Sequence, residues 1–385
     1  MKKNQPPVIL AIDTSCDDTS VAVTQGLTVL SNIVASQTDL HRQYGGVFPT
    51  VAKQAHRQNI EPSILAAIKR AKVTWQQIDA VAVTQGPGLA PALEVGIAKA
   101  KELAKKHHKP LVAVNHIEGH MLSALAERNS KHLVIPHSVA GSQVNQRSRN
   151  TLPAGRQESG MTNCFPILAM VVSGGHTEFI LIKQIGEYEV LGSTIDDAAG
   201  ECLDKVGRIL NLGYPAGPTM EKLAKMGNEH KFAFPLPMTT SKDFNLSFSG
   251  LKTYARRQIE TLETKGQLDK QTIYDFAASF QYAVFRHITY KLSKVFTDYP
   301  NLGQVWLGGG VAANIKLREM IRTALRDVRS VKTRLIASLS SPYSKSLCSD
   351  NAAMIGVVAG FKLERGEVVK NLDKLERKPR WKIGN

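Results

Sequence analysis

The sequence predicts an α/β protein made of two related halves. Residues 8–25 and 167–183 share one pattern, an apolar run, a short polar turn and a second apolar run, which predicts a β-hairpin in each. Residues 305–325 predict a strand that ends in three glycines (308–310) and leads into a periodic helix. Backbone N–H groups at such a turn can bind a phosphate, although a plain tight turn explains one glycine run equally well. Together, the three segments favour two α/β domains with a nucleotide between them.

Amphipathic helices are expected between the strands, which completes the alternation of an α/β fold. Their apolar spacing places them at residues 57–71, 91–107, 196–211, 249–263 and 271–298.

Residues 129–163 interrupt this pattern, because they are rich in Ser, Asn, Gln, Gly and Arg and have no sustained period. We expect a long exposed insertion, and its arginines could contact a polyanion or be merely solvated. The insertion separates an N-terminal domain (residues 1–128) from a C-terminal domain (residues 164–385) that carries further helices and a basic tail. The tail, residues 375–385, is expected to be ill-ordered.

Composition narrows the class of protein. With 385 residues, 43% apolar and 21% charged, the chain is neither disordered nor a collagen or disulfide scaffold. Its 49 Lys and Arg against 33 Asp and Glu give a net charge of +16, which favours a polyanionic partner over a basic surface without one. The four cysteines lie far apart without a C-x-x-C pair, and no stretch reaches the ~20 apolar residues of a membrane span. We therefore expect a cytoplasmic protein with no membrane segment.

The segment VNHIEGH carries the sharpest chemical signal. His116 and His120 are four residues apart, so on a helix both imidazoles project from one face and could bind a divalent metal. Glu118 falls elsewhere on the helix, so this is not the H-E-x-x-H pattern of zinc peptidases. Two histidines and one carboxylate would suit iron(II) or zinc as a Lewis acid, whereas a purely structural pair is the alternative. The third ligand is open among Asp350, Asp13, Asp17 and Asp204.

A second group of candidate residues spans 196–223. Asp197, Asp204 and Glu221 lie beside glycines, where a carboxylate can accept hydrogen bonds from ribose hydroxyls. Helix capping by Asp196 or Asp197 and a solvated Asp204–Lys205 pair are the alternatives.

A third candidate is the helix start at residues 247–257. Ser249, Gly250 and Lys252 could bind an anion there, or Ser249 could be a plain N-cap.

Many motifs, in a fixed order along the chain, carry a resemblance to one protein family. They are AIDTSCDDTS, YGGVFP, TQGPGLAPAL, NHIEGH, VVSGGHTEFI, STIDDAAGECLDK, GYPAGP, LSFSGLKT, GGGVAAN and SDNAAMIG. In this order they resemble the bacterial TsaD family of tRNA N6-adenosine threonylcarbamoyltransferases, formerly called O-sialoglycoprotein endopeptidases. The similarity covers residues 9–380 except for the insertion at 129–163.

The resemblance implies the actin/Hsp70/sugar-kinase (ASKHA) fold, with two RNase-H-like domains around a nucleotide cleft. It implies an acyltransferase that moves the threonylcarbamoyl group of threonylcarbamoyl-AMP to N6 of adenosine 37, in tRNAs reading codons that begin with A. The implied partners are the tRNA, a catalytically inactive TsaB-like paralogue and a small TsaE-like ATPase. An ATP-hydrolysing or non-catalytic tRNA-binding member of the same fold is the alternative.

The resemblance also implies roles for individual residues. It assigns His116, His120 and Asp350 to a metal, most often iron(II) with zinc possible. The residues that it assigns to substrate are Val171, Val172, Ser173, Gly174, Gly175, Asp204, Gly217, Glu221 and Asn314. From the chemistry of the reaction, we expect Asp17 or Asp18 to accept the proton of the attacking amine, and Gly174, Gly175 and the 308–310 run to cradle the phosphate.

The chain departs from the usual family motifs at several positions outside the proposed metal ligands. Aspartates replace glutamates at Asp13 and Asp18, Asn115 replaces a frequent histidine, and Ala216 replaces a glycine. Thr50 and Gln54 replace a Glu and an Arg, a change that could alter contacts with a partner or with tRNA.

Overall fold

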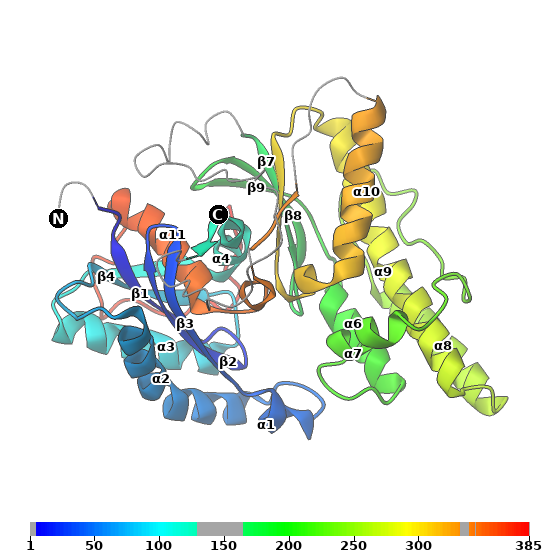
Figure 1. The fold of residues 1–385 in the computed structure, drawn as a ribbon, viewed down its shortest axis with the longest axis horizontal. Helices are drawn as coiled ribbons and strands as arrows, with labels where there is room; N and C mark the ends of the chain where they lie inside the picture. Colours follow the sequence, from blue (N-terminus) through cyan, green and yellow to red (C-terminus); the bar gives the residue numbers. More distant parts are fainter. Residues whose placement is uncertain (1–4, 129–164, 332–338, 343, 385) are drawn as a thin grey trace, which may run out of the picture.

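The computed structural model describes residues 5–128, 165–331, 339–342 and 344–384, so the insertion expected at 129–163 lies outside the described residues. It contains two mixed β-sheets with helices on their outer faces and between them (Figure 1). The first sheet contains β1 (Val8–Asp13), β2 (Asp18–Gln25), β3 (Thr28–Ser36), β4 (Ala80–Gly86), β5 (Leu111–Asn115) and β6 (Glu127–Arg128). The second contains β7 (Ile167–Val172), β8 (Thr177–Gln184), β9 (Glu187–Ser193), β10 (Gln304–Gly308) and β11 (Leu339–Ser340).

The two sheets repeat one topology. Their strand orders are β5-β4-β1-β2-β3-β6 and β11-β10-β7-β8-β9, so apart from the short β6 the five strands are arranged alike. Each sheet opens with an antiparallel three-stranded meander and adds two strands parallel to its first strand. Both predicted hairpins are confirmed, and the repeat is the pair of related halves that the sequence predicts.

The helices are α1 (Thr38–Arg42), α2 (Pro49–Ala71), α3 (Ala90–Lys106), α4 (His116–Leu122), α6 (Ala199–Ile209), α7 (Gly217–Ala224), α8 (Ser249–Thr264), α9 (Lys270–Asp298), α10 (Ile315–Val331) and α11 (Ala352–Glu364). Most predicted helix bounds hold to within a few residues, but α2 begins at Pro49 rather than at residue 57. Proline suits the first turn of a helix because its missing N–H has no partner there in any case. In its first turns α2 buries only the small Ala52 and Ala55 and the polar His56, so a search for large apolar residues at the helix period misses its start.

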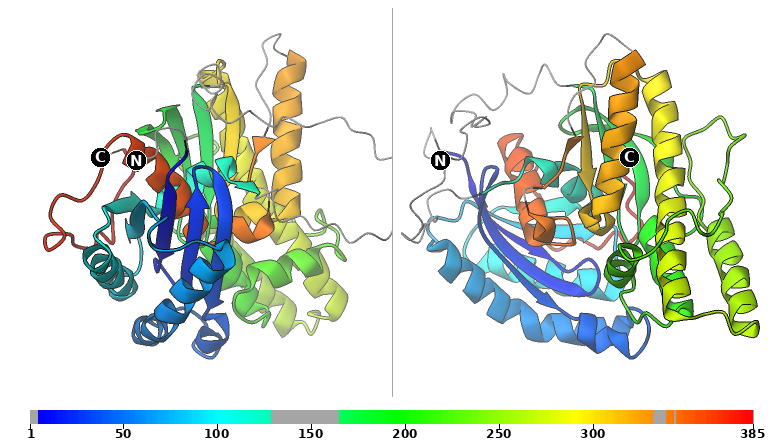
Figure 2. Two further views of the ribbon diagram at one scale, coloured as in Figure 1. Left: turned by 60° about the vertical axis from the view of Figure 1, so that its left-hand side comes forward. Right: turned by 45° about the vertical axis from the view of Figure 1, so that its right-hand side comes forward.

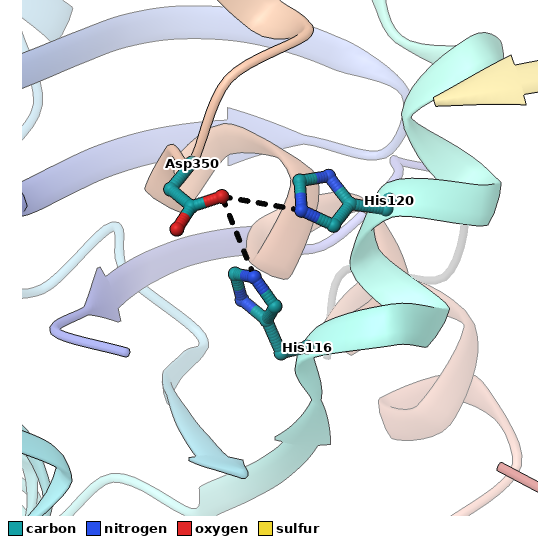
Figure 3. A group of neighbouring side chains, drawn as sticks. All are labelled: His116, His120 and Asp350. Atoms are coloured by element: carbon teal, nitrogen blue, oxygen red, sulfur yellow. Dashed lines mark ion pairs between the residues drawn. The ribbon is translucent and has the colours of Figure 1, made fainter. Parts of the chain in front are cut away.

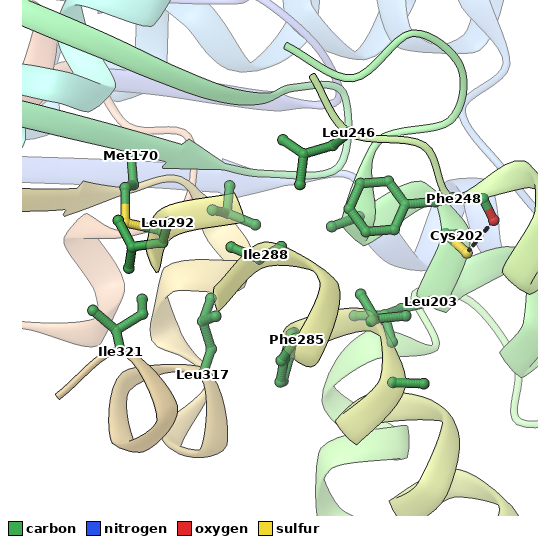
Figure 4. Close-up of a cluster of buried hydrophobic side chains, with 14 of the residues drawn as sticks. Met170, Cys202, Leu203, Leu246, Phe248, Phe285, Ile288, Leu292, Leu317 and Ile321 are labelled. Atoms are coloured by element: carbon green, nitrogen blue, oxygen red, sulfur yellow. Dashed lines mark hydrogen bonds between the residues drawn. The ribbon is translucent and has the colours of Figure 1, made fainter. Parts of the chain in front are cut away.

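Three hydrophobic cores separate the layers. The outer face of the first sheet packs against α2 and α3, and that of the second packs against α6 to α10 (Figures 1 and 4). The helices α4 and α11 fill the layer between the two sheets, in a core that contains residues of both. On β1, Ile9 faces this shared core and Leu10 faces α2 and α3, so the strand is apolar on both sides.

Helix α11 follows the second sheet in sequence, yet it lies against strands of the first (Figure 1). The segment after it then passes beside α3 and β4 (Figure 2), where Asp373 pairs with Lys105 at 2.8 Å. Further on, Lys378 N–H donates to the Gln85 carbonyl oxygen at 2.8 Å. A Cβ on Gly86 would lie 1.9 Å from the Lys378 carbonyl oxygen, so the two backbones are in close contact. The expectation of an ill-ordered tail is therefore wrong for residues 375–384, because apolar burial and these backbone contacts hold the segment in place.

Among the described residues, no helix is long and apolar enough to cross a membrane.

Candidate metal centre and substrate site

Helix α4 carries both histidines of the VNHIEGH segment. It starts directly after β5, where the Asn115 side chain accepts hydrogen bonds from the N–H groups of Ile117 at 2.8 Å and Glu118 at 3.3 Å. This is an N-cap, which satisfies helix N–H groups that have no carbonyl partner. His116 opens the helix and His120 lies one turn later, with ring centroids 4.6 Å apart. The prediction that both rings share one face is confirmed.

Asp350 completes a three-residue cluster with them (Figure 3). It precedes Asn351, whose side chain caps α11 by accepting from Met354 N–H at 3.2 Å. One oxygen, Oδ1, lies 3.4 Å from His116 Nε2 and 3.2 Å from His120 Nε2. The ligand atoms of the three side chains all lie within 4.8 Å of one another, so Asp350 is the carboxylate, of the four considered, that groups with both histidines.

The environment of the cluster fits a metal ion. His120 is fully buried; its Nδ1 lacks a hydrogen-bond partner among the described residues, and its Nε2 has the Asp350 oxygen at 3.2 Å without the alignment of a hydrogen bond. His116 Nδ1 and Asp13 Oδ2 are also buried without such a partner, 3.7 Å apart. Polar atoms left unpaired in an interior cost free energy, and a cation between two imidazoles and a carboxylate would relieve that cost.

The three side chains of the cluster change one another's pKa values. Burial disfavours the charged form of His116, but Asp350 and Asp13 outweigh it and raise the pKa of His116 to about 9. Burial lowers the pKa of His120. Burial also opposes ionisation of Asp350, yet the two histidines outweigh it and hold the Asp350 pKa well below its usual value. A metal ion binding here would therefore displace a proton from His116.

Glu118 lies apart from the cluster, as its place in the motif predicts. It is buried, and its Oε1 accepts from the Tyr188 hydroxyl at 2.9 Å while Lys362 Nζ is 3.9 Å from Oε2. Glu118 therefore has structural partners and is not placed to act as a general base at the cluster.

The β7–β8 turn holds the predicted Val-Val-Ser-Gly-Gly segment. The side chains of Val171 and Val172 are buried in two different cores, so a ligand could meet only their backbone. Ser173 Oγ accepts from His176 N–H at 3.0 Å and closes the turn. A Cβ built on Gly174 or Gly175 meets nothing within 4 Å, so there is open space beside their backbone.

The glycine run after β10 differs from its prediction. A Cβ on Gly308 would lie 2.1 Å from the His120 carbonyl oxygen, and one on Gly309 would lie 2.4 Å from that of Val172. These glycines are required by close backbone packing against α4 and β7. The run also leads into a short 3₁₀ helix, η4 (Gly310–Ala313), and α10 begins only after Asn314. Only Gly310 borders open space, so the expected phosphate cradle at a helix start does not follow from this turn.

Hydrogen bonds bring two further pairs of predicted substrate residues close together: Asp204 with Gly217, and Glu221 with the neighbour of Asn314. Asp204 Oδ1, on α6, accepts from the N–H groups of Ala216 at 2.8 Å and Gly217 at 2.9 Å, so it is no solvated partner of its neighbour in α6. Glu221, on α7, accepts from Ile315 N–H at 3.0 Å, directly beside Asn314. Asn314 in turn caps α10 and donates to Gln281 at 2.8 Å.

The acidic residues before α6 have other partners than those expected. Asp196 accepts from Ser247 Oγ, Phe248 N–H and both Ser249 groups, so it caps α8 rather than α6. Ser249 is therefore a donor to Asp196 and not the N-cap. Lys252 is held in an ion pair with Asp197. Asp196, rather than an external anion, therefore occupies the first N–H groups at the start of α8.

Asp17 lies in the turn between β1 and β2, and Asp18 is the first residue of β2. Burial raises the pKa of both side chains, that of Asp18 to about 6, and the charge of Asp350 adds to the effect. Asp18 Oδ1 is buried without a hydrogen-bond partner among the described residues. Burial raises the pKa of Asp204, and the charge of Asp17 adds to the effect.

Sequence reasoning missed His176, which follows Ser-Gly-Gly in the β7–β8 turn. Burial, together with the positive charges of the nearby His116 and His120, lowers its pKa to about 4. A titratable residue directly after the two glycines of a predicted substrate turn is the sequence signal that could have identified His176.

Comparison with known proteins decides the family. The family model for tRNA N6-adenosine threonylcarbamoyltransferase, TsaD, matches residues 28–141 and 150–357. The chain belongs to the TsaD family. A relative named tRNA N6-adenosine threonylcarbamoyltransferase from Thermosipho africanus is 42% identical over 376 residues, 98% of this chain and 100% of the relative.

A TsaD relative from Acaryochloris marina, which bears the same name, is 40% identical over 97% of this chain and 94% of its own length. Among solved structures, the ROK hexokinase from Thermus thermophilus superposes with a TM-score of 0.45 at 14% identity, over 93% of this chain and 99% of that one.

Proposed function

We propose that this protein transfers the threonylcarbamoyl group of threonylcarbamoyl-AMP to N6 of adenosine 37 in tRNAs that read codons beginning with A, and releases AMP. The observation that carries the proposal is the cluster of the buried His116 and His120 with the half-buried Asp350, in a chain of the TsaD family. An ATP-hydrolysing relative of the same fold would leave this cluster without a task.

The same three side chains would hold one divalent metal, which we propose to be iron(II), with zinc as the second candidate. Two imidazoles and one carboxylate with free positions suit either ion. When bound, such an ion supplies Lewis-acid polarisation of an oxygen of the donor substrate. Asp13 lies 3.7 Å from His116 Nδ1, and would orient that ring from behind.

We assign different parts of the adenylate to the remaining predicted residues. The open backbone at Gly174 and Gly175 would supply N–H groups to the phosphate. Asp204 positions the start of α7 by holding Gly217, and Glu221 with Asn314 would meet the ribose at the start of α10.

The transfer step needs no nucleophile from the protein. The N6 lone pair of the adenosine forms a bond to the carbamoyl carbon, the bond from that carbon to the phosphate oxygen breaks, and AMP leaves with the electron pair. An amine conjugated to adenine is a poor nucleophile, so correct positioning has to supply much of the rate. The proton lost from N6 would pass to Asp17 or Asp18. With a pKa of about 6, Asp18 is mostly ionised at pH 7 and can accept it.

The experiment is mass spectrometry of nucleosides from an unmodified tRNA transcript. It is incubated with the full-length protein, threonylcarbamoyl-AMP, and the proposed TsaB-like paralogue and TsaE-like ATPase. Wild type should form threonylcarbamoyladenosine, and His116→Ala should not. His108→Asn is the matched control, because His108 is exposed at the end of α3 with φ of +52°, which asparagine tolerates. Absence of product with wild type, while a reference enzyme works with the same partners, would refute the proposal.

A further inference from the structure

A groove lined by cationic side chains, Lys252 among them, lies beside the proposed substrate site. It has a volume of about 570 Å³ and lies between α6 and α8 of the second half. Four of its lining side chains are cationic, and the complete lining is Lys205, Arg208, Ile209, Lys252, Thr253 and Arg256.

Ion pairs orient these cations. Asp197 holds Lys205 at 2.6 Å and also pairs with Lys252, which fixes two ammonium groups at one wall. Arg256 pairs with Glu260 at 2.7 Å while its side chain stays 68% exposed. Lys205 also pairs with Glu201 at 2.8 Å, so its ammonium group already has two carboxylate partners. Lys252 and Arg256 each have one carboxylate partner in this set, and with three and five N–H donors they retain donors for an external phosphate.

Arg208 connects the groove to the other half of the protein. Its Nη1 donates to the Gly45 carbonyl oxygen at 2.7 Å, in the loop between α1 and α2. This loop carries Tyr44 and Phe48, whose rings stack with centroids 5.0 Å apart and an interplanar angle of 22°. Tyr44 is 49% and Phe48 47% exposed, which is unusual for two large rings side by side.

A buried hydrogen-bond network fixes the aromatic loop. Phe48 N–H donates to His41 Nδ1 at 3.3 Å, and Nε2 of the same ring bonds Gln37 Oε1 at 3.2 Å. The Gln37 amide bonds His56 Nδ1 at 3.2 Å, and His56 Nε2 bonds the Cys16 carbonyl oxygen at 3.0 Å. Since both oxygens can only accept, both rings carry their proton on Nε2. These hydrogen bonds thus connect the loop to the Cys16 backbone, directly before Asp17.

The groove starts close to the proposed substrate site. Helix α6 begins beside the β7–β8 turn, where Gly200 N–H donates to the Ser173 carbonyl oxygen at 3.1 Å. At about 1.5 Å per residue, Lys205 and Arg208 lie only about 8 Å and 12 Å along α6 from Gly200. A few nucleotides of extended chain span that distance.

We propose that this groove and the Tyr44–Phe48 pair form the docking surface for the anticodon arm of the tRNA. The inference rests on the proposed function and names the surface by which the substrate is held. Phosphates bind the cations of α6 and α8, and an unpaired base stacks on the exposed rings, as single-stranded RNA does on aromatic side chains. Both contacts would hold the loop while the target base leaves its stack and enters the site.

The test uses the full-length protein and a synthetic anticodon stem-loop RNA, with affinity measured over a range of salt concentrations. Arg256→Ala should weaken binding and make the slope of log affinity against log salt shallower by about 0.7–0.9, as expected for one lost phosphate contact. Arg257→Ala is the matched control, because it removes the same charge from the adjacent exposed position of α8 outside the groove. Equal slopes for Arg256→Ala and wild type would overturn the inference.

The aromatic pair has its own test in the same assay. Tyr44→Leu should weaken binding by roughly five-fold to a hundred-fold, the range for one lost base stack, and Tyr44→Phe should restore it. RNA affinity unchanged in Tyr44→Leu, with loss of binding to the paralogue, would assign the rings to a protein partner and refute the docking surface. If the wild type modifies tRNA but these variants bind as it does, only this inference fails. If the wild type does not bind the RNA at all, the proposed function fails with it.

Discussion

The buried carboxyl of Asp18 allows a quantitative prediction about stability. Its Oδ1 has no hydrogen-bond partner among the described residues, and burial raises the pKa of Asp18 to about 6. Asp18→Asn removes the charge and keeps the size of the side chain. We expect this variant to be more stable than wild type at pH 8 and no more stable at pH 4.

The sign and size follow from proton linkage. The folded-state pKa lies above the unfolded value of 3.8, so between these values the folded state binds more protons and stability falls as pH rises. Above pH of about 6 the whole penalty is present. A carboxyl pKa raised from 3.8 to about 6 corresponds to about 3 kcal/mol. Because the new amide also leaves a buried polar atom unpaired, we expect a net gain of about 1–3 kcal/mol at pH 8.

The assay is urea unfolding of wild type and Asp18→Asn at pH 4 and pH 8, with a chelator present so that no metal contributes. The control is Asp39→Asn on α1, where the carboxylate is 87% exposed and pairs only with Arg42, so its change should stay within about 0.5 kcal/mol at either pH. A variant that is destabilised equally at both pH values would show that burial of charge is not what Asp18 contributes.

Three more predictions concern other contacts. Adding iron(II) or zinc at a hundred times its dissociation constant should stabilise wild type by about 2.7 kcal/mol and leave His120→Ala unchanged; an equal shift in both, seen by thermal unfolding, would place the ion elsewhere. Asn115→Ala should lower the free energy of unfolding by about 1 kcal/mol, measured with urea, because α4 loses its N-cap. Asn115→Ser should keep most of the wild-type stability, because serine also caps. Gly86→Ala should detach the segment around Lys378, because its Cβ would lie 1.9 Å from that carbonyl oxygen; limited proteolysis should then cut there, and unchanged resistance would contradict the contact.

The local patterns of the sequence predicted much of the fold. Both hairpins lie where alternating apolar residues end in small polar turns, and His116 and His120 share a helix face because their spacing follows the helix period. These features depend on neighbours along the chain, which a sequence displays directly.

Long-range partners could not be predicted in the same way. Asp196 resembles a cap for the helix that follows it but caps α8 some fifty residues later, and Gly308 and Gly309 resemble a phosphate loop but make room for neighbouring backbone. Asp350 was only one of four candidate ligands from the spacing, and the packing of α11 beside α4 is what brings it to the histidines. Basic composition suggested a free tail, whereas Leu375 is buried in the core with α2 and α3, and Ile383 is buried in the core between the two sheets.

The place of α11 between the sheets has a consequence for protein synthesis. The strands of the first sheet end at β5, apart from the short β6, but roughly 250 residues separate Asn115 from the end of α11 at Glu364. At 5–20 residues per second, the ribosome needs roughly 10–50 s to make that stretch. During this time the face of β1 and β2 that α11 covers stays uncovered, and His116 and His120 stand without Asp350. The nascent first half thus keeps an apolar face exposed until α11 emerges, and His116, His120 and Asp350 come together only when both halves are made.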